Sequence, residues 1–166
     1  MSTTERAAFG ATLMQVPREF GVRDDELTEV VVPSDLRSVK APEGKIIAQL
    51  RRCHYSDEAI FAIKLALEEA LTNGVRHGNR GDASKTVTVR FFVDPDRVII
   101  MVRDEGNGFV PELVPDPTAE ENLERPSGRG IMLMHAYMTK VCYNSSGNEV
   151  WMYKENCGGA SSQCCA

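Results

Sequence analysis

Residues 56–77 read Ser-Asp-Glu-Ala-Ile-Phe-Ala-Ile-Lys-Leu-Ala-Leu-Glu-Glu-Ala-Leu-Thr-Asn-Gly-Val-Arg-His. Ser56 can cap a helix here, because its hydroxyl can accept a hydrogen bond from a free backbone N–H of the first turn. Glu69, Asn73 and His77 stand four residues apart and form a polar strip on this helix, next to a strip of apolar residues. The segment therefore predicts an amphipathic helix with polar groups at the rim of the core. The apolar strip has helical spacing and comprises Ile60, Ile63, Leu67, Ala70, Leu71 and Gly74.

The polar strip on this helix contains side chains suited to two chemical tasks, metal binding and proton transfer. The amide oxygen of Asn73 is a neutral hard ligand for Mg²⁺, and the carboxylate of Glu69 can accept a proton. An ordinary solvated helix face is the alternative, and Glu68, Glu69, Asn73 and Arg76 would serve it equally. The helix alone leaves both interpretations open.

The rest of the chain predicts a sheet and two further helices. Strands are expected at 27–33, on a sheet edge, and in two hairpins, 86–93 with 97–103 and 140–145 with 149–154. A helix is expected from Ser34 or Asp35 toward Cys53, and another over 130–138. This order predicts an α+β fold with one mostly antiparallel sheet and helices on one face.

Length and charge restrict the possible functions. A chain of 166 residues fits one domain, expected at 27–154, with a leader of uncertain order at 1–26 and a flexible tail at 155–166. The net charge of −5 argues against a nucleic-acid partner, because phosphate backbones require clustered Lys and Arg. No apolar run approaches the roughly 20 residues that cross a bilayer, so no membrane association and a cytoplasmic location are expected.

The five cysteines fall into two groups. Cys53 and Cys142 lie in apolar segments and are interpreted as core residues. Cys157, Cys164 and Cys165 lie in the tail, where no His or carboxylate completes a four-ligand set, so a metal site is not expected there.

An aspartate followed by glycines ends the strand at 97–103, in Arg103-Asp-Glu-Gly-Asn-Gly-Phe109. Asp104 at a strand end can accept a hydrogen bond from an exocyclic amine such as that of adenine. Gly106 and Gly108 would let the backbone approach the base. A simple strand-terminating turn is the alternative.

A second glycine motif, Ser127-Gly-Arg-Gly-Ile131, precedes the helix at 130–138. Glycines before a helix leave its N–H groups facing an anion, and Arg125 and Arg129 can chelate phosphate oxygens. An ordinary loop-to-helix junction is the alternative. The long loop between the two glycine motifs contains four prolines, and loops of that length in a compact domain are usually functional.

The three motifs, in this order, resemble those of the GHKL (Bergerat-fold) ATP-binding superfamily. Glu69-Ala-Leu-Thr-Asn73 with His77-Gly-Asn79 resembles the N box, Asp104 to Phe109 the first glycine box, and Pro126 to Ile131 the second. Within the superfamily, the chain most resembles the bacterial anti-sigma-factor serine/threonine kinases, over about residues 27–154. The resemblance implies a Bergerat-type two-layer sandwich in which residues 110–127 form a lid.

The resemblance also implies roles for individual residues. Glu69 would be the general base, Asn73 the Mg²⁺ ligand, and Asp104 the residue that recognises adenine. The nucleotide site would further include His77, Gly106, Gly108, Phe109, Arg125, Gly128, Arg129, Gly130 and Ile131. Glu149 departs from the family pattern, which favours a smaller residue near the last strand, and Arg76 and Asn79 have no assigned role.

The resemblance further implies ATP and Mg²⁺ as ligands and two protein partners. The kinase would phosphorylate an anti-sigma-antagonist protein and sequester a sigma factor. A homodimer of the kinase is one possible oligomeric state. Two alternatives stay open at this point. One is a non-catalytic switch whose partner binding is gated by nucleotide, and the other is an interaction domain without nucleotide.

Overall fold

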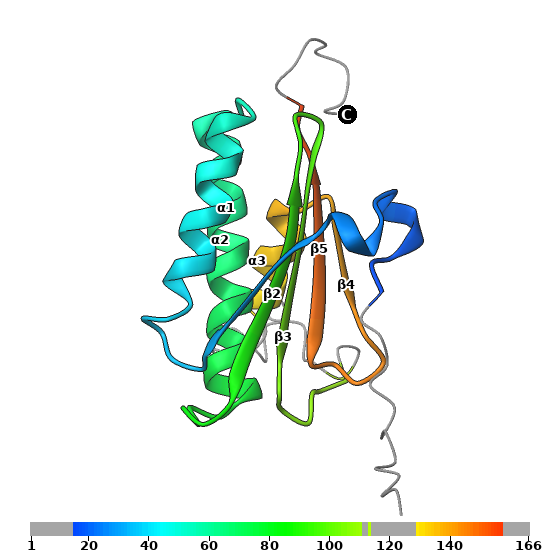
Figure 1. The fold of residues 1–166 in the computed structure, drawn as a ribbon. Coiled ribbons are helices and arrows are strands. Elements are labelled where there is room, and N and C mark those ends of the chain that lie inside the picture. Colours follow the sequence, from blue (N-terminus) through cyan, green and yellow to red (C-terminus); the bar gives the residue numbers. More distant parts are fainter. Residues whose placement is uncertain (1–14, 111–112, 114–128, 158–166) are drawn as a thin grey trace, which may run out of the picture.

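Five antiparallel strands form one sheet, with helices against one of its faces (Figure 1). The computed structural model describes residues 15–110, 113 and 129–157. The strand order is β1-β2-β3-β5-β4. The strands are β1 (Thr28–Pro33), β2 (Thr86–Val93), β3 (Arg97–Asp104), β4 (Lys140–Tyr143) and β5 (Glu149–Glu155). The predicted α+β fold and the edge position of β1 are confirmed.

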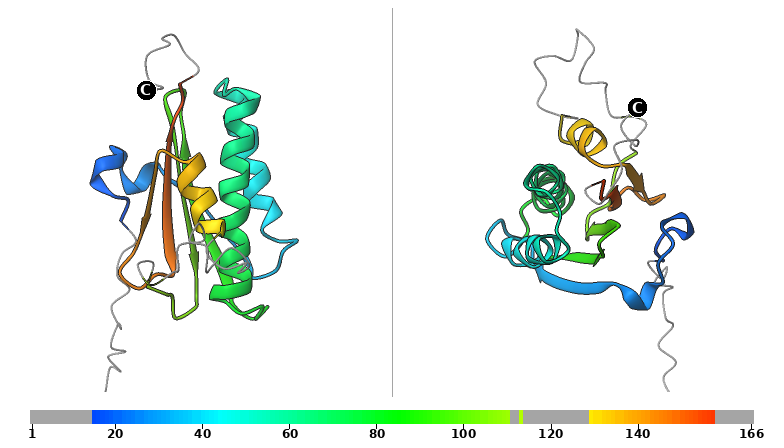
Figure 2. Two further views of the ribbon diagram at one scale, coloured as in Figure 1. Left: turned by 180° about the vertical axis from the view of Figure 1, so that it is seen from behind. Right: turned by 90° about the horizontal axis from the view of Figure 1, so that it is seen from above.

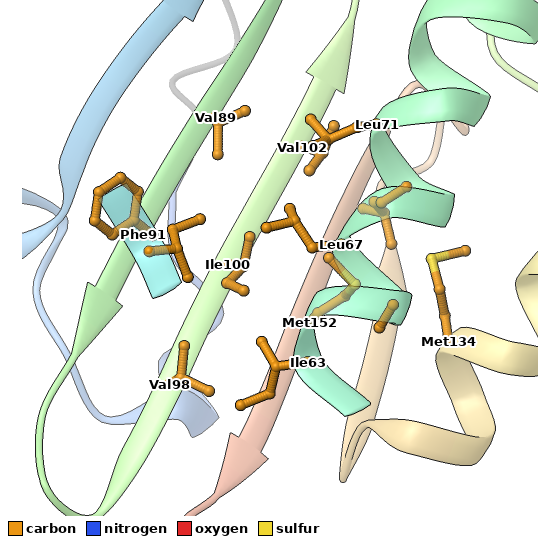
Figure 3. Close-up of a cluster of buried hydrophobic side chains, with 14 of the residues drawn as sticks. Ile63, Leu67, Leu71, Val89, Phe91, Val98, Ile100, Val102, Met134 and Met152 are labelled. Carbon is orange, nitrogen blue, oxygen red and sulfur yellow. The ribbon is translucent and has the colours of Figure 1, made fainter. Parts of the chain in front are cut away.

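Three helices, α1 (Lys40–Arg52), α2 (Asp57–Asn73) and α3 (Arg129–Tyr137), cover the inner face of this sheet. Alternate strand residues face them, as the period of two along a strand requires. Figure 3 shows the resulting core, in which the middle of α2 packs on β2, β3 and β5 and α3 contributes Met134. Its labelled side chains are Ile63, Leu67, Leu71, Val89, Phe91, Val98, Ile100, Val102, Met134 and Met152.

The helix α2 begins as its sequence predicts, because the Ser56 side chain accepts a hydrogen bond of 3.1 Å from the N–H of Ala59. The helix α1 begins later than expected, at Lys40 instead of near Asp35. The Asp35 carboxylate instead accepts hydrogen bonds of 2.9 Å from the N–H groups of Arg37 and Ser38. These bonds stabilise a separate turn before the helix, since a short acidic side chain competes for the backbone in this way.

Residues 15–26 lie on the outer face of the sheet, opposite the helices (Figure 2), and are called the N-terminal strap below. The strap contains two short 3₁₀ helices, η1 (Arg18–Phe20) and η2 (Asp24–Glu26). Its Phe20 is 1% exposed, and Arg97 donates a hydrogen bond of 2.8 Å to the Phe20 carbonyl. The last twelve residues of the segment expected to be a leader of uncertain order therefore pack on the domain.

The cysteines Cys53 and Cys142 are partly buried. Cys53 packs against the core between the sheet and the helices. Cys142 packs against the outer apolar cluster, which lies between the sheet and the strap and consists of Val16, Phe20, Ile99, Met101 and Trp151. Cys157 is exposed, and Cys164 and Cys165 lie outside the described residues. Within the part of the chain that the structure describes, no helix is long and apolar enough to cross a membrane.

Candidate functional site

A cavity of about 530 Å³ opens between the C-terminal half of α2, the ends of β3 and β5, and the start of α3. Its volume lies in the range of pockets that hold small molecules, about 300–1,000 Å³. Four segments of the sequence, at 69–78, 102–109, 130–134 and 143–150, supply its walls. The predicted site residues among those that line it are Glu69, Asn73, His77, Asp104, Gly108, Phe109, Gly130 and Ile131.

The wall formed by α2 carries the predicted polar strip. Glu69 and Asn73 are half-buried, whereas His77 is exposed, so the strip runs from the rim of the core to the solvent. After Asn73 the chain continues in a π-turn, η3 (Gly74–Gly78), and turns of this kind are frequent at functional sites.

The start of α3 lies directly against this strip. A Cβ at Gly130 would overlap the Glu69 carboxylate and would lie 3.6 Å from the Asn73 amide nitrogen. A larger residue here would have to displace the Glu69 carboxylate, so glycine lets the N-terminal end of α3 approach the carboxylate and the amide closely. The N-terminal end of a helix favours an anion, which suits a phosphate held beside Asn73.

The opposite wall carries Asp104, the last residue of β3. The N–H of Gly106 donates a hydrogen bond of 2.7 Å to Asp104 Oδ1. The carboxylate packs so tightly on Gly78 that a Cβ there would overlap it. Burial raises the pKa of the Asp104 carboxyl, against the opposing effects of the Gly106 N–H and of the positive charges of Lys85 and Arg103. This half-buried carboxylate can accept a hydrogen bond from an amine of a ligand in the pocket.

An aromatic pair and an apolar floor complete the cavity. Phe109 and Tyr143 pack edge to face, with ring centroids 5.2 Å apart. Burial raises the pKa of Tyr143 to about 12, so its phenol stays neutral at physiological pH. The floor can accommodate a flat heterocycle, and it is formed by Ala70, Val102, Met134 and Val150.

Glu149, which departs from the family pattern, turns its carboxylate away from the cavity that it partly lines. Its Oε1 accepts a hydrogen bond of 2.6 Å from the Trp151 indole N–H, and that indole belongs to the outer apolar cluster. Asn148 lies beside Asp104 instead, where its carbonyl accepts a hydrogen bond of 3.0 Å from the Asp104 N–H. Sequence reasoning missed Asn148, although alternation along the strand could have found it, since Val150 and Met152 face the core.

Two predicted residues within the described part of the chain, Gly106 and Arg129, do not line the cavity. Gly106 supports Asp104 from behind, and Arg129 is exposed at the first position of α3. Arg125 and Gly128 lie outside the described residues, as does most of the predicted lid. Thr72 and Arg76 line the cavity without having been assigned a role from the sequence.

A metal ion at the described walls of this cavity would need ligands beyond those that these walls supply. Among the described residues, no group of three His, Cys, Asp or Glu side chains could hold a metal ion. The cavity instead offers the amide oxygen of Asn73, with the Glu69 carboxylate one turn away. One amide oxygen combined with phosphate oxygens and waters is a donor set that Mg²⁺ accepts.

Comparisons with known proteins agree with this geometry. Residues 32–154 match the family model of the histidine kinase-like ATPase domain. The chain is 34% identical to the serine-protein kinase RsbW of Bacillus subtilis over 135 residues, which cover 76% of this chain and 83% of that protein. It is 32% identical to the protein of the same name from Listeria monocytogenes over 110 residues, or 62% and 70% of the two chains.

A solved structure supports the same fold. The crystal structure of the RsbU and RsbW domains of a Mycobacterium tuberculosis protein matches with a TM-score of 0.53 and 13% sequence identity. The match covers 78% of this chain and 32% of that chain. At this identity, the likeness concerns the fold alone.

Proposed function

The chain belongs to the histidine kinase-like ATPase domain family, and from this membership we propose that it is an ATP-dependent protein serine/threonine kinase that acts as an anti-sigma factor. The observation that carries the proposal is the joining of Glu69, Asn73 and Asp104 around one cavity of about 530 Å³. A phosphotransferase needs a proton acceptor, a ligand for the cation and a group that binds the adenine, all within reach of one nucleotide.

The proposed position of ATP follows from the polarity of the cavity walls. The adenine lies at the apolar floor, where its exocyclic amine donates to the Asp104 carboxylate. The triphosphate extends toward Asn73 and the N-terminal end of α3, at Gly130. The Asn73 amide oxygen would hold Mg²⁺ together with phosphate oxygens and waters, and the ion would neutralise charge on the phosphates.

The proposed reaction moves the γ-phosphoryl group to a serine or threonine hydroxyl of a protein. The hydroxyl oxygen forms the new bond to phosphorus, the bond from phosphorus to the β-phosphate oxygen breaks, and ADP leaves. Glu69 accepts the hydroxyl proton, as its half-buried position beside Gly130 allows. Positioning and charge neutralisation supply most of the acceleration in reactions of this class.

The proposed partners are an anti-sigma-antagonist protein, which receives the phosphate, and a sigma factor, which the domain sequesters in the cytoplasm. The similarity to proteins named serine-protein kinase RsbW supports a protein serine as the acceptor. The proposed assembly includes a homodimer.

The experiment that tests the kinase is Glu69→Gln, assayed with labelled ATP and a purified anti-sigma-antagonist protein. Removal of a general base should slow phosphate transfer by about 10²- to 10⁴-fold, whereas the affinity for Mg·ATP should stay within about twofold. Glu68→Gln is the matched control, because Glu68 pairs with Lys40 at 3.0 Å and is not a cavity-lining residue.

Two outcomes would contradict the proposal. The absence of phosphate transfer by the folded wild-type protein would rule out the proposed kinase activity. Unaltered regulation and nucleotide affinity in Glu69→Gln would favour a nucleotide-gated switch.

A further inference from the structure

Asn79 is a buried polar residue beside the cavity that the proposed mechanism does not use. Its side chain is 0% exposed, and all of its amide groups are hydrogen-bonded. Nδ2 donates to Ser34 Oγ and to the Thr86 carbonyl, both at 2.9 Å, and Oδ1 accepts from the Glu105 N–H at 2.8 Å. Buried amides satisfied in this way hold their partners in fixed positions, because a lost bond leaves a buried polar group unpaired.

These bonds connect the two walls of the cavity. The Asn79 N–H donates to the Gly74 carbonyl at 2.8 Å, and Gly74 directly follows Asn73 on the α2 wall. On the other wall, the Glu105 N–H belongs to the residue after Asp104. Asn79 therefore ties the Asp104–Gly106 turn to the helix that carries Asn73.

Glu105 is held from a second side as well. Its carboxylate accepts hydrogen bonds from the Thr86 N–H at 2.5 Å and the Thr86 hydroxyl at 3.1 Å. Thr86 also accepts from Asn79, so Asn79, Thr86 and Glu105 form a closed ring of hydrogen bonds next to Asp104. This ring restrains the backbone that adjoins Asp104, and with it the Gly106 N–H that donates to Asp104 Oδ1.

We propose that Asn79 is a positioning residue that gives the cavity its preference for adenine over guanine, by holding Asp104 in place. The inference rests on the proposed function. Adenine presents an exocyclic amine where guanine presents a carbonyl oxygen, so a carboxylate attracts one base and repels the other. This discrimination needs a fixed carboxylate, because hydrogen bonds are made only within about 3.2 Å and weaken steeply when misaligned.

The test compares Asn79→Ala with Asn156→Ala. The Asn156 amide donates to the Pro95 carbonyl at 2.8 Å, in the turn at the opposite end of β2 and β3, so this variant is a control for loss of stability alone. The measurements are the dissociation constants of Mg·ATP and Mg·GTP by calorimetry, together with thermal unfolding of each variant.

Asn79→Ala should lose about tenfold or more of its ATP affinity, because the hydrogen bond to the base is no longer aligned. Its GTP affinity should stay within twofold, so the ratio of the two constants falls. Asn156→Ala should keep the wild-type ratio even where its Tm falls. Asn79→Ser is the second variant, for use where Asn79→Ala does not fold, because a water can enter the space that the shorter side chain leaves. The same fall in the ratio of the two dissociation constants is expected of it.

A folded Asn79 variant with the wild-type ratio overturns this inference alone. A wild-type protein that binds ATP no better than GTP overturns the proposed function and this inference with it. An Asn156→Ala ratio that falls as far as that of Asn79→Ala also overturns the inference, because loss of stability would then explain both.

Discussion

At the scale of single residues, the Asp104 carboxyl shows how the site is tuned. It ends a buried strand and packs on Gly78, and burial raises its pKa. A carboxyl with a raised pKa in the folded state binds its proton more tightly there than in the unfolded chain. Stability therefore falls as the pH rises through the ordinary carboxyl pKa of 3.8 toward the raised one, and the loss is complete above it. The fold thus retains a charge that is useful to a ligand and unfavourable without one.

Asp104→Asn is expected to raise the Tm of the protein without nucleotide at neutral pH, because it removes the buried charge. The variant should also lose roughly 10- to 100-fold in ATP affinity, since it loses a charge-assisted hydrogen bond. Thermal unfolding with and without Mg·ATP measures both effects.

Asp82→Asn is the control of opposite sign, because hydrogen bonds from Ser84 lower the pKa of exposed Asp82. Its Tm should not rise, and its ATP affinity should match that of the wild type. An Asp104→Asn variant whose Tm still increases normally on addition of Mg·ATP would contradict the role of Asp104.

At the scale of elements, the approach of α3 to α2 completes the phosphate side of the cavity. The two helices contact each other, and Gly130 brings the N-terminal end of α3 against the Glu69 carboxylate. A larger residue at position 130 would displace either the carboxylate or the helix. Gly130 of the second glycine motif therefore has a steric function, in addition to any contact with phosphate.

Gly130→Ala is expected to slow phosphate transfer by about 100-fold, because a shift of about 1 Å in a reacting group can cost that much. Gly44→Ala is the matched control in helix α1, where a Cβ would meet nothing within 4 Å. That substitution should instead stabilise the fold by about 0.5 to 1 kcal/mol, as alanine does in place of glycine inside helices. Single-turnover transfer and urea unfolding measure the two effects, and wild-type transfer by Gly130→Ala would refute the steric argument.

At the scale of the whole molecule, the sheet is covered on both faces. The helices bury the inner face, and the N-terminal strap covers Ile99, Met101 and Trp151 on the outer one. Phe20 of the strap stacks on Tyr153, with ring centroids 5.3 Å apart. The strap, residues 15–26, lies wholly before residues 32–154, the range that matches the family model.

Phe20→Ala is expected to lower the free energy of unfolding by about 3 to 5 kcal/mol, the usual cost of deleting a buried phenylalanine. Phe61→Ala is its control, because Phe61 is 59% exposed and its loss should change stability by no more than about 0.5 kcal/mol. Urea unfolding followed by fluorescence of Trp151, the only tryptophan in the sequence, measures both. A loss below about 1 kcal/mol in Phe20→Ala would mean that the strap is not part of the folded unit.

Most of the elements could be predicted from local patterns. Ser56 marks the start of α2, the Asp94-Pro95-Asp96 turn joins β2 to β3, and alternation identifies the buried strands. The start of α1 was wrong because Asp35 caps a separate turn, a choice between two local bonding patterns that sequence spacing does not resolve. The strap was missed as a packed element because the buried residues that join Val16 and Phe20 in one cluster come from strands more than 70 residues away, and they are Ile99, Met101 and Trp151.

The sequence alone determined the fold class and the identities of the polar groups at the site, because helical and strand periodicities are local properties of the chain. The tertiary structure decided which of those groups meet. It brought Glu69, Asp104 and Gly130 to one cavity, turned the Glu149 carboxylate outward, and placed the Asn79 amide between the two walls. These outcomes depend on contacts between segments that are far apart in the sequence and that only the assembled sheet and its packed helices bring together.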